Sequence, residues 1–209
     1  MKAWGWRFTT LAALVTLACA LLLPAARTPA QPQATEAIAS EIVLTVNPAQ
    51  STVHWSVDSS LHLVHGTFAV KSGSVHFDPQ TGRAGGEIVV LATSGESGND
   101  SRDARMHKEI LETAKYPDAV FRPTQVEGRV APSGMSDAKI RGVFSIHGAD
   151  HDLVAPAHVE LTGDHWKGTA QFEIPYVDWG IKNPSNFLLK VKKVVNVELE
   201  LSGTLKTPK

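Results

Sequence analysis

Apolar and polar residues alternate one by one along most of this chain. The clearest runs are 53–57 and 195–201, where every second residue is Val, Trp or Leu. A period of two places alternate side chains on one face of a strand, whereas a helix has a period of about 3.6 residues. Turn-forming residues separate the runs, as at 78–82 and 162–164. Short strands at close spacing predict an all-β fold, either a barrel or a sandwich.

The alternation also predicts which side chains point inward. We expect an apolar inward face that runs through all the strands and is formed by Trp55, Val57, Phe68, Val70, Val75, Phe77, Ile88, Val90, Phe121, Phe144, Ile146, Phe172, Ile174, Val197, Leu199 and Leu201. Periodicity alone leaves two alternatives open. These side chains either fill the interior completely, as in many small barrels, or surround a ligand.

One internal stretch lacks the two-residue period. Met106, Ile110 and Ala114 recur every four residues, and Asn99 offers a capping side chain just before them. The spacing predicts one short helix over 101–113.

The N-terminal residues predict export. Basic residues precede an uncharged apolar run over 8–23, and small residues follow it. This order is typical of a signal peptide, which we place at 1–30, with cleavage after Ala30 or alternatively after Ala26. Residues 31–40 are then a flexible leader, and the folded domain spans 41–205. We expect a periplasmic or secreted protein.

The single cysteine, Cys19, lies inside the apolar run. A cysteine that follows such a run can be a site of lipid attachment. Here Thr16 replaces the usual aliphatic residue, and the run continues beyond the cysteine to Leu23, so we favour cleavage near Ala30. The mature chain then contains no thiol, and its stability must come from burial rather than from disulfides.

Charge limits the classes of partner. Without Lys2, Arg7 and Arg27, 17 of the 20 basic residues remain against 21 acidic ones, a net charge near −4. Nucleic acids and anionic membranes attract basic proteins, so neither is expected to recruit this chain. The apolar run is shorter than the roughly 20 residues that span a bilayer, and no later run is as long, so we expect no stable membrane insertion.

Four longer motifs are more specific than the alternation. They are 51–57 (STVHWSV), 73–79 (GSVHFDP), 115–117 (KYP) and 175–185 (PYVDWGIKNPS). Together they resemble the YceI-like family of bacterial exported lipid-binding proteins. The resemblance implies a lipocalin-like antiparallel barrel of about eight strands, whose interior holds the tail of an isoprenoid lipid or a quinone, with no other cofactor. It implies nothing about the oligomeric state.

A lipid also needs contacts for its polar end. A helix across the barrel mouth would present cationic side chains there, and a second polar and aromatic cluster follows the strand that ends near Ile174. The candidate headgroup residues are therefore Arg102, Arg105, His107, Tyr176, Trp179 and Lys182. The alternative is a purely structural role, in which Arg102 pairs with a neighbouring acid.

Other functions have weaker support. His62 and His65, with His54 and His76, suggest a metal site, but zinc needs three or four convergent ligands and the strand parity turns His54 and His76 outward. No arrangement of nucleophile and base, or of paired acids, predicts an enzyme. Two alternatives to a lipid carrier remain: a solid-core adaptor or scaffold domain without ligand, and a histidine-based metal-binding periplasmic protein.

Overall fold

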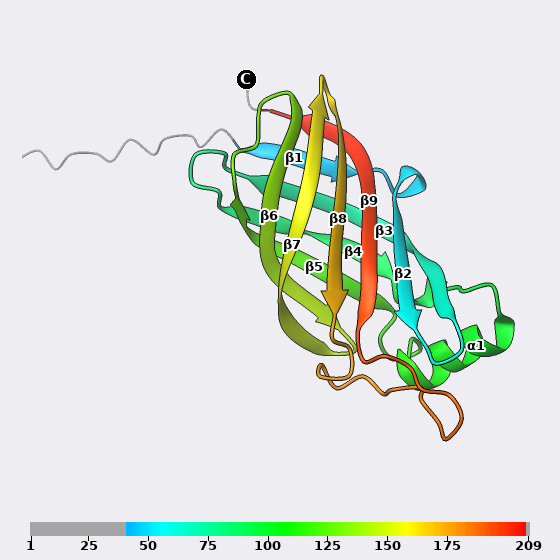
Figure 1. Cartoon of the computed structure of the whole chain (residues 1–209). Helices are drawn as coiled ribbons and strands as arrows, with labels where there is room; N and C mark the ends of the chain where they lie inside the picture. The colour runs from blue at the N-terminus through cyan, green and yellow to red at the C-terminus, as the bar shows by residue number, and fades with distance from the viewer. Residues whose placement is uncertain (1–40, 208–209) are drawn as a thin grey trace, which may run out of the picture. The chain divides into compact units, whose positions relative to one another are not determined.

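The computed structural model describes residues 41–207, so the predicted signal peptide, the leader and Cys19 lie outside the described residues. Nine strands form one antiparallel sheet (Figure 1). In chain order they are β1 (Ile42–Val46), β2 (Thr52–Asp58), β3 (Leu63–Phe77), β4 (Ala84–Leu91), β5 (Asp118–Glu127), β6 (Gly134–Ile146), β7 (Ala149–Thr162), β8 (His165–Ile174) and β9 (Val195–Lys206).

The sheet closes on itself because β1 and β2 share one position in it. Both strands pair with β3 on one side and with β9 on the other, and a short 3₁₀ turn, Pro48–Gln50, separates them. Counted as one interrupted strand, they complete an eight-stranded ring in which each strand lies beside its neighbour in the chain. The prediction of an antiparallel barrel of about eight strands is confirmed.

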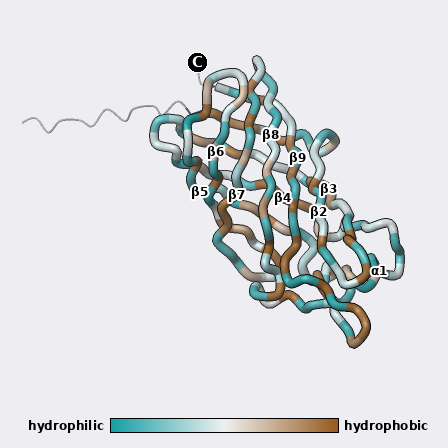
Figure 2. The backbone as a smooth tube through the Cα atoms, in the orientation of Figure 1, coloured by the Kyte–Doolittle hydropathy of each residue, from teal (hydrophilic) through white to brown (hydrophobic). Residues whose placement is uncertain are grey.

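Two β-bulges interrupt the regular pairing of the strands. The register of β3 against β4 shifts between Val70 and Ser72, and that of β5 against β6 shifts between Pro123 and Gln125. Each bulge adds one residue and reverses the inward and outward parity of the rest of its strand. This explains why the inward residues of β3 have even numbers before the bulge and odd numbers after it. Figure 2 shows the resulting alternation of hydrophobic and hydrophilic residues along the strands.

Strand connections alternate between the two ends of the barrel. One end, which we call the mouth, carries the turn at 59–62, the β4–β5 connection and the segment 175–194. Figure 1 shows α1 and this last segment, in orange, at the same end. The opposite end is closed by packed side chains: Leu161 is only 2% exposed, and the buried Trp166 donates its indole N–H to the Thr45 carbonyl at 3.2 Å. Access to the interior is therefore from the mouth.

The helix is shorter than predicted. It begins at α1 (Asp100–Arg105), capped by the Asn99 side chain, and continues as one π-helical turn over Met106–Ile110. Glu112, with a φ of 47°, ends it in the left-handed region, which leaves the predicted end at 113 outside the helix. Short 3₁₀ turns at Pro48–Gln50 and Ala92–Ser94 were not predicted. None of the described helices has the length and hydropathy needed to cross a bilayer.

Candidate functional site

A cavity of about 540 Å³ runs inside the barrel from Trp166 to the helix at the mouth. This volume lies within the range of about 300–1,000 Å³ that is typical of small-molecule sites. Its wall consists mainly of aliphatic and aromatic side chains from the inward faces of the strands. Eight strands are enough to enclose one slender ligand without opening an aqueous channel.

Fifteen of the sixteen predicted inward residues line this cavity. They are Trp55, Val57, Phe68, Val75, Phe77, Ile88, Val90, Phe121, Phe144, Ile146, Phe172, Ile174, Val197, Leu199 and Leu201. The remaining residue, Val70, is not part of the cavity wall. Val70 is 4% exposed and belongs to the packed core, where it sits beside the bulge of β3.

The sequence analysis missed much of the wall on β6, β7 and β8. These residues include Ile140, Leu153, Ala155, Ala157, Val159, Trp166 and Ala170. The signal was present as alternation over 153–161, but alanines contribute little to a hydrophobic pattern. Ala157 pairs with Ala170 across the two strands. Because these side chains are small, they leave open the space that larger residues would fill.

The helix closes part of the mouth with both apolar and charged side chains. Met106, Ile110, Arg102 and Arg105 all line the cavity. The Arg102 guanidinium is held in place, since Nε donates to Ser97 Oγ at 2.7 Å and an Nη atom donates to the Ser97 carbonyl at 2.8 Å. Arg102 therefore has a structural role in addition to its place at the cavity.

Asp103 anchors the start of the helix to the loop before it. Its carboxylate accepts hydrogen bonds from the Ser97 N–H at 3.0 Å and from the Ser97 hydroxyl. Partial burial raises the pKa of Asp103, but the Ser97 hydrogen bonds and the Arg102 charge outweigh it and hold the pKa below its ordinary value. The ionised carboxylate thus stabilises this corner of the mouth.

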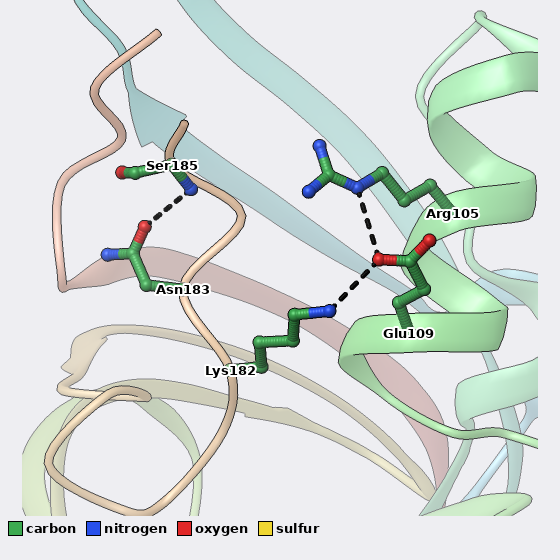
Figure 3. A network of polar contacts seen from close by, with 5 residues as sticks. All are labelled: Arg105, Glu109, Lys182, Asn183 and Ser185. Atoms are coloured by element: carbon green, nitrogen blue, oxygen red, sulfur yellow. Dashed lines mark hydrogen bonds and ion pairs between the residues drawn. The ribbon is translucent and has the colours of Figure 1, made fainter. Parts of the chain in front are cut away.

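A second polar network joins the helix to the segment 175–194 (Figure 3). Glu109 accepts from Lys182 Nζ at 3.0 Å and pairs with Arg105 Nε at 3.5 Å. The hydrogen bond from Lys182 is the main reason that the pKa of Glu109 lies below its ordinary value. In the same segment, Asn183 accepts from the Ser185 N–H at 2.8 Å. The two elements that frame the mouth are therefore linked.

The remaining headgroup candidates divide into two groups. Tyr176 is buried and lines the cavity, but its hydroxyl donates to the Lys192 carbonyl at 2.9 Å, and burial raises its pKa. His107, Trp179 and Lys182 are not part of the cavity wall. His107 bonds to the Gly95 carbonyl, Trp179 stacks on the His151 ring with centroids 4.2 Å apart, and Lys182 pairs with Glu109. Headgroup contact by any of the six candidates stays a prediction, and Arg102, Arg105 and Tyr176 are the three that line the cavity.

The histidines do not converge. In the described part of the chain, no three His, Cys, Asp or Glu side chains are grouped so that they could hold a metal ion. His54 is exposed, and His76 lies on the outer face beside Gly85. His65 belongs to β3 rather than to a loop, and His62 stands at the mouth.

A closed antiparallel barrel around an apolar cavity, with its polar groups gathered at one end, defines the class of lipocalin-like barrels. Within that class, the chain belongs to the YceI-like domain family, whose sequence profile matches residues 44–203.

Similar proteins agree with this assignment. The UPF0312 protein of Pseudomonas savastanoi pv. phaseolicola is 26% identical over 182 residues, which cover 82% of this chain and 90% of that protein. The UPF0312 protein of Pseudomonas syringae pv. tomato is 28% identical over 160 residues, or 71% of this chain and 80% of that one.

Solved structures share the fold. BcnA of Burkholderia cenocepacia has a TM-score of 0.63 at 18% identity, covering 76% of this chain and 99% of its own. A polyisoprenoid binding domain from Saccharophagus degradans, implicated in plant cell wall breakdown, has a TM-score of 0.56 at 15% identity, covering 78% of this chain and 98% of its own.

Proposed function

We propose that this protein is an exported carrier that holds the tail of an isoprenoid or similar long apolar lipid inside the barrel and catalyses no reaction. The observation that carries the proposal is the apolar cavity of about 540 Å³ that opens toward the mouth. A scaffold domain with a solid core would have packed side chains in place of this cavity. The YceI-like family and the polyisoprenoid binding domain of similar fold support an isoprenoid as the ligand class.

The energetics favour an apolar tail. Burial is worth about 0.8 kcal/mol per methylene, so fifteen tail carbons would contribute on the order of 10 kcal/mol before the cost of association. A polar ligand would lose its hydration without finding enough partners in this wall. Tight binding therefore needs no ion pair inside the barrel.

The test fills the cavity and measures the lipid. Ala155 and Val154 are adjacent in β7, but Ala155 lines the cavity and Val154 is 40% exposed on the outer face. We expect purified wild-type protein, extracted with organic solvent and analysed by mass spectrometry, to release a long-chain lipid in near-stoichiometric amount. Ala155→Phe should lose most of this lipid because its ring occupies the tail's space.

Val154→Phe is the matched control and should retain the lipid at the wild-type level. Ile174→Trp fills the cavity from a second strand and should reproduce the effect of Ala155→Phe while the barrel still unfolds cooperatively. Absence of lipid from the wild type, with no binding of added isoprenoid, would contradict the proposal and favour the scaffold alternative.

A further inference from the structure

Exposed apolar side chains gather at the mouth. Among the described residues, six large hydrophobic side chains are exposed, and four of them belong to two mouth segments. Phe187 and Leu188, in the segment 175–194, are 94% and 84% exposed, while Leu61 and Leu63, at the β2–β3 turn, are 74% and 54% exposed. Figure 2 shows the segment 175–194 ending in a hydrophobic loop at the lower end of the molecule. We call the part of this segment around Phe187 and Leu188 the tip. Exposed groupings of this kind mark interaction sites.

The tip is held in a defined turn. Asn186 Oδ1 accepts hydrogen bonds from the N–H groups of Leu188 at 2.9 Å and Leu189 at 2.7 Å, and the Asn186 N–H donates to the Leu189 carbonyl at 2.8 Å. This turn directs Phe187 and Leu188 to solvent, while Leu189 lines the cavity. The exposure of the two side chains is therefore fixed by backbone geometry.

The two mouth segments form one surface. The Ser60 N–H donates to the Lys190 carbonyl at 2.8 Å, and the Lys190 N–H donates to Ser60 Oγ at 3.1 Å. Ser59 also forms a β-bridge with Val191. Leu61 is both solvent-exposed and part of the cavity wall. The apolar surface at the tip is thus continuous with the interior of the barrel.

The segment that carries Phe187 and Leu188 is rich in lysine. The segment 175–194 contains four lysines and one acid, Asp178, whereas the whole chain has a formal charge of −1. Lys182 pairs with Glu109 and Lys192 with Asp58. Within the part of the chain that the structure describes, Lys190 and Lys193 have no ion-pair partner. The acidic net charge suggested that anionic membranes would not recruit this chain. Net charge is an average, however, and lysines are concentrated in this one segment at the mouth.

We propose that the mouth docks on the surface of an anionic lipid bilayer, with Phe187 and Leu188 inserted among the acyl chains and Lys190 and Lys193 against the headgroups. Apolar side chains beside basic ones are the combination that binds such interfaces, and it needs no membrane-spanning segment. Docking in this orientation brings the cavity entrance against the lipid. The proposal goes beyond the carrier function, because a barrel with an empty cavity would dock equally well.

The test measures binding to vesicles. The protein is recovered from the exported fraction with its N-terminal residue determined, so that all variants share the same N-terminus. We expect sedimentation with vesicles of phosphatidylcholine and phosphatidylglycerol, weaker binding to phosphatidylcholine alone, and a decrease with added salt. The double variant F187S/L188S should bind at least about tenfold more weakly, and K190E/K193E should lose more than about tenfold on the anionic vesicles.

Matched controls lie at the closed end of the barrel. Met135 is 79% exposed there, and Lys167 and Lys206 are exposed on strands that end there. M135S removes an exposed apolar side chain, and K167E/K206E reverses two exposed lysine charges as K190E/K193E does. Both variants should bind vesicles as the wild type does. In a local readout, the indole of Phe187→Trp should be quenched by brominated acyl chains and that of Met135→Trp should not.

Equal weakening by the mouth and control variants, or no vesicle binding by the wild type, would overturn the proposal. Self-association of the wild type that F187S/L188S abolishes, without vesicle binding, would assign this surface to a second copy and would also overturn it. Lipid content is measured in the same preparations. An empty cavity with intact docking would therefore contradict the carrier function alone.

Discussion

At the scale of single residues, the cavity should make the same Leu→Ala substitution lower the free energy of unfolding by different amounts at different positions. Leu161 in β7 is 2% exposed and packed on all sides, whereas Leu199 in β9 is half-buried and lines the cavity. Leu161→Ala removes packed atoms and should lower the free energy of unfolding by about 2–5 kcal/mol. Leu199→Ala enlarges an existing space and should cost clearly less. Denaturant unfolding of delipidated protein measures both values, and equal losses would indicate an interior without a ligand cavity.

The sequence predicts residues well where the information is local. Trp55 and Phe172 line the cavity as expected, because alternation along a strand decides which way a side chain points. Val70 is buried as the alternation predicts, but it lies beside the bulge between β3 and β4 and does not line the cavity. The pairing that sets this bulge is not visible in the sequence of one strand. Ala155 and Ala157 were missed because their importance lies in the volume they leave empty, which depends on the residues across the barrel.

At the scale of elements, Asp103 should make the anchoring of the helix sensitive to acid. Its folded-state pKa lies below the ordinary 3.8, so its contribution to stability is complete above that value and is lost as the pH falls through the folded-state pKa. We expect the difference in unfolding free energy between wild type and Asp103→Asn to be constant above about pH 5 and to shrink below about pH 4. Chemical denaturation across this range measures the difference.

Ser97→Ala provides a second arm of the same measurement. It removes the hydroxyl that donates to the Asp103 carboxylate but leaves Asp103 in place. In the Ser97→Ala background, the stability difference between Asp103 and Asp103→Asn should therefore depend less on pH. If the difference between wild type and Asp103→Asn persisted undiminished to about pH 2, the carboxylate charge would not be the stabilising feature.

The helix also shows where element boundaries escape sequence analysis. Met106 and Ile110 were expected on one helical face, and both reach the cavity. The end of the helix was misplaced because Glu112 adopts a left-handed conformation that its residue type does not favour. Its carboxylate pairs at 2.9 Å with His147, in the turn between β6 and β7, which is a tertiary contact. Propensity therefore located the element, and long-range contacts set its end.

At the scale of the whole molecule, the predicted export can be tested directly. Mature protein recovered from producing cells should begin near Gln31 and carry no acyl group, because the apolar run continues past Cys19. N-terminal sequencing and intact mass spectrometry measure both properties. An acylated Cys19 at the N-terminus would instead indicate a lipid-anchored protein.

The fold class was accessible from the sequence because a meander of alternating strands has few ways to bury its apolar face. Closure of the ring was implied by the family resemblance rather than by the alternation, which also fits a sandwich. The lysine-rich surface at the mouth could not be predicted from the sequence, since net charge carries no information about which turns lie at the same end of the barrel. Lys190 and Leu61 are far apart in the chain and lie in hydrogen-bonded neighbouring turns.

The closed ring also implies an order of folding events, in which neighbouring strands pair before the two ends of the chain meet. Every strand can pair with its chain neighbour as a local hairpin, but β9 must find β1 and β2, as in the pairing of Thr52 with Glu200. Contacts between the two ends of a chain form slowly, because a long loop must close first. Until they form, β9 on one side and β1 and β2 on the other present open edges that can template pairing between molecules. The interval before β9 pairs with β1 and β2 is therefore when this chain is most prone to aggregation.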